Sequence, residues 1–285
     1  MTIAKRANRQ PAGMRVPERA DIPPQAAPAS SSRHVLSRRS VMFEIGLATA
    51  AYLSYFLVRG FTQSGFQQAA DNANLVIRFE KWTNLYHETV VQGAMKHHDS
   101  LLNLANWVYI WGHWPVIIVV GTWLLWSSPR EYRTLRNTFL ISGGIGLLIF
   151  ATFPVAPPRL LDVGLIDTIT ERSHSYRVLQ PPAFVNQYAA MPSLHFGWDL
   201  IIGIVLVRNA RSPYVRALGF LLPVAMGWAV IATGNHFVID TVAGAALALF
   251  GLMVATLGAE KLDKGQERIQ FLAARALRLP RPTNA

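Results

Sequence analysis

The chain of 285 residues contains no cysteine. The absence of thiols excludes disulfides, metal sites with cysteine ligands and catalysis by a cysteine nucleophile. Charged residues are also few, at 15% of the chain, whereas hydrophobic residues make up 51%. The apolar residues gather in long runs and are not spread periodically, which is typical of a polytopic membrane protein.

Six of these runs are candidate membrane spans. Crossing a hydrocarbon layer about 30 Å thick takes about 17 to 25 apolar residues. The fourth run is short, and Asp199 interrupts it. The sequence therefore predicts an all-α protein with six transmembrane helices in a bundle, at residues 41–59, 104–126, 137–155, 192–207, 214–233 and 237–258.

The formal net charge is +11. Such a charge could indicate nucleic-acid binding, but the basic residues do not form one patch. They precede the first span, separate the second from the third and the fourth from the fifth, and follow the sixth. The positive-inside rule places these alternate connections in the cytoplasm. We therefore expect an integral protein of the plasma membrane, with both termini cytoplasmic and no nucleic-acid partner.

The predicted membrane domain, residues 41–259, lies between two basic cytoplasmic tails. Residues 1–40 are rich in proline, alanine, serine and arginine and lack an apolar core, which predicts a disordered tail and not a cleavable signal. Residues 260–285 form the second tail. The connection at 60–103 contains "LVIRFEKWTNLYHETVVQGAMKHH", whose apolar positions recur at helical spacing. This pattern predicts an amphipathic helix in the membrane interface.

The second long outer connection, residues 156–190, follows the third span. Closely spaced prolines in "PVAPPRLLD" are expected to end that span. The connection is long enough for a lid or a substrate-entry loop, and an ordinary connecting loop is an equal alternative.

Several ionisable residues are expected at one depth, near the outer boundary of the membrane. Arg159 follows the third span, His195 begins the fourth, and His236 and Asp240 stand at the start of the sixth. Burying an ionisable group in hydrocarbon costs several kcal/mol, so these residues are candidates for function.

The types and spacing of these residues indicate phosphoryl transfer. His236 and Asp240 are four residues apart, which places both on one face of a helix, one turn apart. A carboxylate bonded to one imidazole nitrogen fixes the tautomer and makes the other nitrogen more nucleophilic. His195, on a neighbouring helix, could act as general acid.

Two further residues fit an anionic substrate. Ser193 suits a helix cap, and the start of its helix would offer N–H groups to an anion. Arg159 supplies a guanidinium that can bind phosphate. The sequence thus predicts a site that uses neither a metal nor another cofactor.

The motifs "PSLH" and "NHFVID" resemble the second and third signature motifs of the type 2 phosphatidic acid phosphatase superfamily. The usual forms are Pro-Ser-Gly-His, and Ser-Arg followed after five residues by His and after three more by Asp. The resemblance implies that His236 is the nucleophile that forms a phosphohistidine. It also implies that Asp240 orients His236 and that His195 protonates the leaving oxygen.

The sequence departs from the usual motifs at several positions. Leu194 replaces the glycine, Ala229 and Val230 replace Ser-Arg, and "PPR" at 157–159 stands in place of Lys-x6-Arg-Pro. This pattern resembles the branch that includes inositol phosphorylceramide synthase. The resemblance implies a lipid phosphotransferase of the inositolphosphotransferase type, with a lipid phosphoester and a hydroxyl acceptor as partners.

Two other functions stay open at this point. One is a lipid phosphate phosphatase that uses water as acceptor, and the other is a transporter with a His/Asp proton relay. The sequence leaves the oligomeric state open.

Further candidates for substrate binding surround the two motifs. Asp199 could brace His195 from the same helix face or line a polar interior. Tyr109 and His113 share one face of the second span, where they could bind a polar headgroup or form interhelical hydrogen bonds. Asn235, beside His236, completes the substrate-binding candidates, which also include Arg159 and Ser193.

Overall fold

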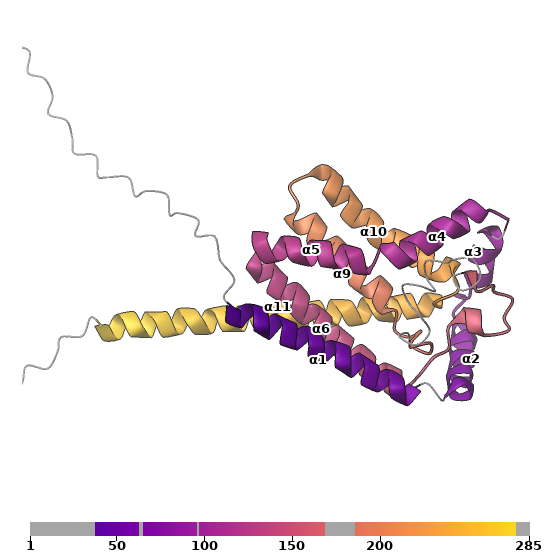
Figure 1. Cartoon of the computed structure of the whole chain (residues 1–285), viewed down its shortest axis with the longest axis horizontal. Coiled ribbons are helices and arrows are strands. Elements are labelled where there is room, and N and C mark those ends of the chain that lie inside the picture. Colours follow the sequence, from indigo (N-terminus) through magenta and orange to yellow (C-terminus); the bar gives the residue numbers. More distant parts are fainter. Residues whose placement is uncertain (1–37, 63–64, 96, 169–185, 278–285) are drawn as a thin grey trace, which may run out of the picture. The chain divides into compact units, whose positions relative to one another are not determined.

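The computed structural model describes residues 38–62, 65–95, 97–168 and 186–277. These residues belong to a unit that runs from Ser37 to Ala285 and is separate from residues 1–36. Within the described ranges the regular elements are helices. One isolated β-bridge pairs Val155 with Ala189, which both lie in loops. The predicted all-α class is therefore confirmed for this part of the chain (Figure 1). The predicted tail of residues 1–40 lies outside the described residues, apart from its last three positions.

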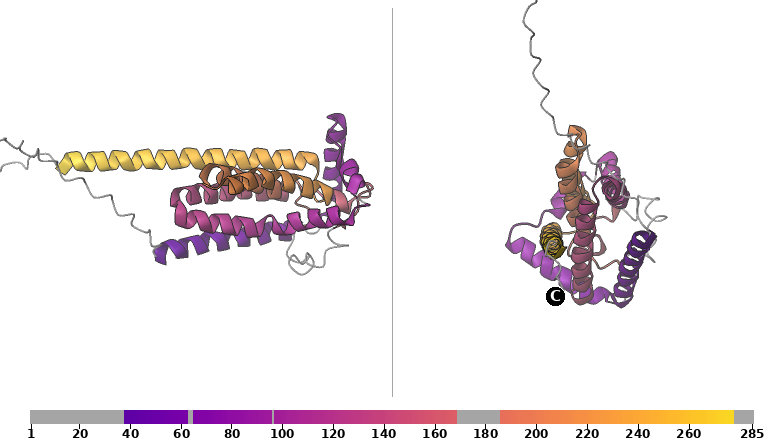
Figure 2. Two further views of the ribbon diagram at one scale, coloured as in Figure 1. Left: turned by 90° about the horizontal axis from the view of Figure 1, so that it is seen from above. Right: turned by 90° about the vertical axis from the view of Figure 1, so that its left-hand side faces the viewer.

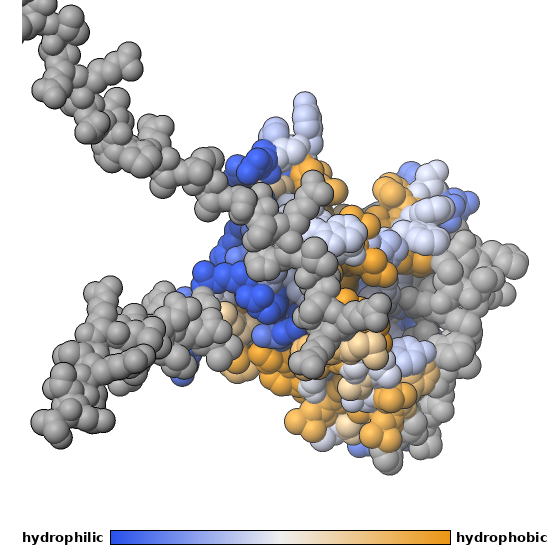
Figure 3. Space-filling view, turned by 60° about the vertical axis from the view of Figure 1, so that its left-hand side comes forward, coloured by the Kyte–Doolittle hydropathy of each residue, from blue (hydrophilic) through white to orange (hydrophobic). Residues whose placement is uncertain are grey.

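Four helices are long and apolar enough to cross a membrane. Large apolar side chains stay exposed on their flanks, for example Phe43 at 60% and Phe220 at 64%. Orange, apolar surface accordingly covers much of the flank of the bundle in Figure 3. These exposed flanks indicate an integral membrane protein. The helices are α1 (Arg38–Thr62), α6 (Pro129–Thr152), α10 (Pro213–Ala232) and α11 (Val238–Leu277).

The second predicted span is two helices, not one. Helices α4 (Asp99–Trp111) and α5 (Trp114–Ser127) meet at an angle of 42°. Pro115 lies in the first turn of α5. Proline has no N–H and its ring clashes with the carbonyl four residues earlier, so it kinks or breaks a helix, and it favours the bend seen here. The break leaves His113 as the N-cap residue of α5.

The fourth predicted span is helix α9 (Leu194–Asn209). Its 16 residues rise about 24 Å, less than the thickness of the hydrocarbon layer. Six spans are therefore not confirmed: the described helices supply four, or five if the bent pair counts as one.

Helix α9 lies inside the bundle, where it contacts α10 and α11 (Figure 2). Ile201 and Ile202 are fully buried. A Cβ atom on Gly197 would collide with the carbonyl oxygen of Gly244 on α11. Close approach of the two backbones therefore depends on small residues, as is common between membrane helices.

The predicted amphipathic helix within 60–103 is also divided. Helix α2 (Phe66–Trp82) and helix α3 (Glu88–Met95) are separated by a turn in which Asn84 has a φ of 56°. Helix α2 lies across one end of the bundle (Figure 2). Its buried apolar face packs on the loops that carry Val155 and Ala190 and on Phe237. Its location in the membrane interface stays a prediction.

The segments after α6 and α10 form the covered end of the bundle. Helix α6 ends at Thr152, just before Pro154, and the short 3-10 helix η1 (Pro158–Leu160) follows. Residues 169–185 of the predicted outer connection at 156–190 lie outside the described residues, so its interpretation as a lid, a substrate-entry loop or an ordinary loop stays open. Helix α11 continues past the predicted sixth span to Leu277, so most of the predicted tail at 260–285 is helical.

Candidate active site

Four segments that are distant in sequence meet at the end of the bundle beneath α2. The backbone N–H of Arg159, in η1, donates to the carbonyl of Gly234 at 2.9 Å. The N–H of Ser193, before α9, donates to the carbonyl of Asp240 in α11, also at 2.9 Å. These bonds join η1 to the loop between α10 and α11, and the start of α9 to the first turn of α11. The structure thereby brings together the residues that the two motifs carry.

The two motif histidines face each other across this junction. His195 lies in the first turn of α9, where the Ser193 hydroxyl oxygen accepts from the N–H of Phe196 at 3.4 Å. The rings of His195 and His236 have centroids 6.2 Å apart and are tilted by 52°. Reacting atoms approach to about 3–3.5 Å before bonds form. A centroid separation of this size allows one phosphate group to contact both rings.

His236 is positioned by a backbone carbonyl as well as by a carboxylate. Its Nδ1 lies 2.7 Å from the carbonyl oxygen of Ala190 and 3.5 Å from Oδ2 of Asp240. Because a carbonyl only accepts, Nδ1 carries the hydrogen and Nε2 keeps its lone pair.

The expectation that His236 and Asp240 share one helix is wrong, because α11 begins at Val238. Asp240 lies in the first turn, where its Oδ2 accepts from the N–H of Phe237 at 2.9 Å. Its carboxylate therefore caps the helix and faces the imidazole at the same time.

The side chain of Arg159 is buried against Asn235, the residue before His236, and is only partly paired. Its side chain is 8% exposed, and its Nε donates to Oδ1 of Asn235 at 3.1 Å. A carboxylate oxygen of Asp167 lies 3.8 Å from the same nitrogen. The Nη1 atom is buried without a hydrogen-bond partner. A buried guanidinium with a free donor is suited to bind an anion.

The turn that holds Arg159 depends on a glycine and on Asn235. Gly234 has a φ of 67°, and a Cβ atom there would lie 3.1 Å from the Cβ of Arg159. The amide of Asn235 donates to Oγ1 of Thr233 at 2.6 Å while its oxygen accepts from Arg159. Asn235 thus positions Arg159, and its side chain is already bonded within the protein.

Asp199 binds His113 and not His195. Nδ1 of His113 lies 2.9 Å from Oδ1 of Asp199, and both side chains are almost fully buried. The His113 ring lies 4.4 Å from the His195 ring, and the Tyr109 ring stacks on His195 at 4.7 Å. His195 is therefore packed between two aromatic rings from the broken α4–α5 pair.

Two buried carboxyl groups at this end were not among the predicted site residues. Glu80 of α2 and Glu88 of α3 are both 0% exposed. Burial and, to a smaller extent, the neighbouring Glu88 together raise the pKa of Glu80 to about 9. The apolar spacing of Ala69, Ala73 and Val76 continues to position 80, so the sequence did contain a sign that Glu80 points inward.

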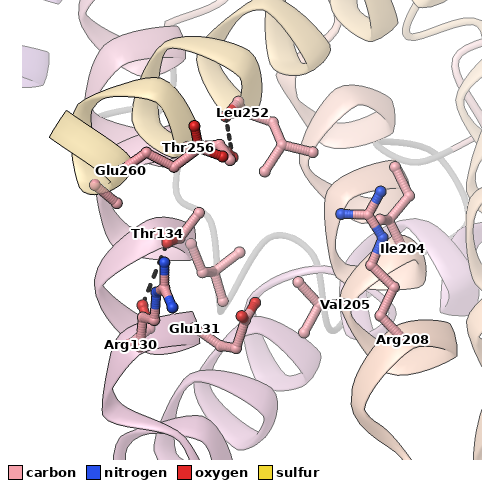
Figure 4. A pocket seen from close by; sticks show the side chains of 11 residues that line it. Arg130, Glu131, Thr134, Ile204, Val205, Arg208, Leu252, Thr256 and Glu260 are labelled. Carbon is pink, nitrogen blue, oxygen red and sulfur yellow. Dashed lines mark hydrogen bonds between the residues drawn. The ribbon is translucent and has the colours of Figure 1, made fainter. Parts of the chain in front are cut away.

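A separate cavity of about 130 Å³ lies at the opposite end of α6, α9 and α11 (Figure 4). It is lined by the charged residues Arg130, Glu131, Arg208 and Glu260 and by apolar residues such as Leu252. The motif residues do not line it. The cavity is therefore not part of the candidate active site.

Sequence comparison connects the chain to one family. The PAP2 superfamily matches residues 74–254, which cover all of the candidate site residues.

Two individual proteins are also similar to part of the chain. The nickel permease LarQ of Lactiplantibacillus plantarum is 32% identical over 108 residues, which is 37% of this chain and 38% of that protein. The chain thus matches well under half the length of this relative. The crystal structure of Aquifex aeolicus LpxE covers 59% of this chain and 92% of its own, with 18% identity and a TM-score of 0.46.

Proposed function

The chain belongs to the PAP2 superfamily, and from this premise we propose that it is a membrane-embedded lipid phosphotransferase of the inositolphosphotransferase type. It moves a phosphoryl or phospho-headgroup of a lipid phosphoester through a phosphohistidine. The observation that carries the proposal is the 6.2 Å separation of the His195 and His236 rings, which come from different segments. The free Nη1 of Arg159 beside them supplies the positive charge.

In the first step, Nε2 of His236 attacks phosphorus. The carbonyl of Ala190 keeps the hydrogen on Nδ1, and the Asp240 carboxylate stabilises the positive charge that develops on the ring. A bond forms between Nε2 and phosphorus, and the bond to the leaving oxygen breaks. His195 gives its proton to that oxygen, while Arg159 binds the non-bridging oxygens.

In the second step, the acceptor replaces the leaving group. Neutral His195 takes a proton from the acceptor hydroxyl, whose oxygen attacks phosphorus and releases His236. If the group on His236 is a phospho-headgroup, an alcohol acceptor gives a new phosphodiester and water gives the headgroup phosphate. If it is a phosphoryl group, an alcohol gives a phosphomonoester and water gives inorganic phosphate. A lipid phosphate phosphatase is therefore the alternative within the same site, since the two activities differ only in the acceptor.

The remaining predicted substrate contacts receive positioning roles in this proposal. His113, Asp199 and Tyr109 hold the ring of His195, since the His113–Asp199 pair is buried and Tyr109 stacks on that ring. Asn235 holds Arg159. The charge pattern of the connections supports an active site that opens toward the extracytoplasmic leaflet.

The test is incubation of the purified protein with a panel of lipid phosphoesters, with and without inositol or other alcohols, followed by mass spectrometry. A new phosphodiester is the expected product. We expect His236→Ala and His195→Ala each to lower turnover by at least about 100-fold, because each removes a proton-transfer or nucleophilic group.

The matched control is His97→Ala, which removes an exposed histidine outside the site. It should retain wild-type turnover. Phosphate release without a new diester would assign the phosphatase instead. Wild-type turnover by a correctly folded His236→Ala protein would disprove the proposed mechanism.

A transporter is the second candidate, and two observations favour it. They are the partial similarity to the nickel permease and the buried His113–Asp199 pair, which is the kind of pair that a proton relay uses. Proteoliposomes that hold the purified protein would distinguish the two. The enzyme proposal expects no uptake of Ni²⁺ and no proton movement coupled to it.

A further inference from the structure

The first turn of α11, which follows His236 directly, is bonded by carboxyl groups from other elements. The N–H of Val238 donates to Oε1 of Glu88 at 2.8 Å, and the N–H of Ile239 donates to Oε1 of Glu80 at 2.7 Å. The preceding N–H, of Phe237, donates to Asp240. Successive N–H groups at this helix start thus bond to carboxylates on α3, α2 and α11 itself.

This arrangement replaces an ordinary helix cap. The first N–H groups of a helix have no partner within it, and a polar side chain just before the helix usually satisfies one of them. Phe237 holds that position here, and its side chain has no polar atom that could accept a hydrogen bond. Since Glu80 and Glu88 occupy these N–H groups, the start of α11 is not available to a phosphate.

The two carboxyl groups are close enough to interact with each other. They accept from successive N–H groups of one helix turn, and Glu88 contributes to the raised pKa of Glu80. Oε2 of each is buried without a hydrogen-bond partner. Two carboxylates in such contact repel each other unless they share a proton, which then forms a bond between them.

We propose that Glu80 and Glu88 are positioning residues that share one proton and fix the first turn of α11, and with it His236, opposite His195. The inference rests on the proposed function for its kinetic consequences, but not for its structural ones. It also gives α2 and α3 a function, which is to hold the nucleophile in place from outside the bundle.

The test compares alanine and glutamine at both positions in the full-length protein. Glutamine keeps an oxygen for the helix N–H and can donate to the remaining carboxylate, whereas alanine removes both bonds. In Glu80→Ala and Glu88→Ala, hydrogen exchange at Val238 and Ile239 should accelerate by about tenfold or more, because the turn opens locally.

The kinetic readout uses the lipid phosphoester that gives the highest wild-type turnover in the panel. Each alanine variant should lower kcat by about 100-fold, since a nucleophile displaced by about 1 Å loses a factor of that size. KM should change little. Glu80→Gln should keep kcat within about threefold of the wild-type value, because the bond from the helix N–H is kept.

The control variant is Asp71→Asn, which alters an exposed carboxylate on the same helix. Unchanged exchange at Val238 and Ile239 in both folded alanine variants would overturn the proposal. If the alanine variants do not fold, the glutamine variants are compared with each other. A kcat loss in Glu80→Gln as large as in the double variant Glu80→Gln/Glu88→Gln would also overturn the proposal. If the wild type turns over no lipid, the exchange experiment still decides the inference, and only the proposed function fails.

Discussion

His113 and Asp199 lie together behind His195, in the interior of the bundle. Asp199 has one carboxylate oxygen without a partner and depends on His113 for the other. The loss of either residue therefore leaves a buried polar group unpaired. This cost is separate from any effect on the chemistry.

The pair can be tested by a double-mutant cycle. We expect His113→Ala and Asp199→Ala each to lower the free energy of unfolding by about 3 kcal/mol, because each leaves an uncompensated buried partner. The double variant should lose less than the sum of the two, with a coupling of about 1–3 kcal/mol. Denaturation of the detergent-solubilised proteins measures these values. Additive losses would show that the two side chains do not support each other.

At the same scale, the sequence predicted which residues meet but not how they are bonded. The spacing of His236 and Asp240 suggested a contact within one helix, yet the nearest partner of His236 is the carbonyl of Ala190. Every residue has a backbone carbonyl, so the sequence does not indicate which carbonyl binds a given side chain. Of the two roles considered for Asp199, the contact with His195 is replaced by one with His113, which lies 86 residues away in the chain.

Helix α2, which is not among the four candidate membrane spans, buries a carboxyl group against the rest of the protein. The titratable groups that interact with Glu80 include Glu88 on α3, Asp240 at the start of α11 and Tyr86 in the turn. Burial raises the pKa of Tyr86, and the two glutamates raise it further. Lys81 lies over the Tyr86 ring, 5.1 Å from its centroid.

The pH dependence of stability follows from the raised pKa of Glu80, about 9 against an ordinary value of 4.5. Between these values the folded protein holds one more proton than the unfolded chain, so its stability falls as the pH rises. The slope is at most about 1.4 kcal/mol per pH unit. The melting temperature of the wild type should therefore fall from pH 5 to pH 9 more steeply than that of Glu80→Gln. Parallel curves for the two proteins would contradict this expectation.

The helix boundaries were predicted well where a single residue type decides them. Pro154 follows the end of α6, and Ser193 caps α9. The break between α4 and α5 was missed, although Pro115 stands in the sequence, because the surrounding run is apolar enough to predict one continuous span. The break moves His113 from the predicted helix face to the N-cap of α5.

For the molecule as a whole, the orientation in the membrane can be tested by labelling. Because the chain has no cysteine, a single introduced cysteine reports one position alone. Asp162 and Arg211 are both exposed, at opposite ends of the bundle. A maleimide that cannot cross membranes should label Asp162→Cys in intact cells and Arg211→Cys only after permeabilisation. The wild type is the unlabelled control, and the reverse pattern would place the site on the cytoplasmic side.

The sequence by itself determined the all-helical class, the apolar helices and the residues of the two motifs. Local hydrophobicity and residue type are sufficient for these features, because they depend on neighbours a few positions apart. Only the tertiary structure decided that α9 is short and central, that His113 and not His195 binds Asp199, and that Glu80 and Glu88 hold the start of α11. These contacts join segments separated by 86 to 159 residues, and packing alone determines which buried polar groups meet across such distances.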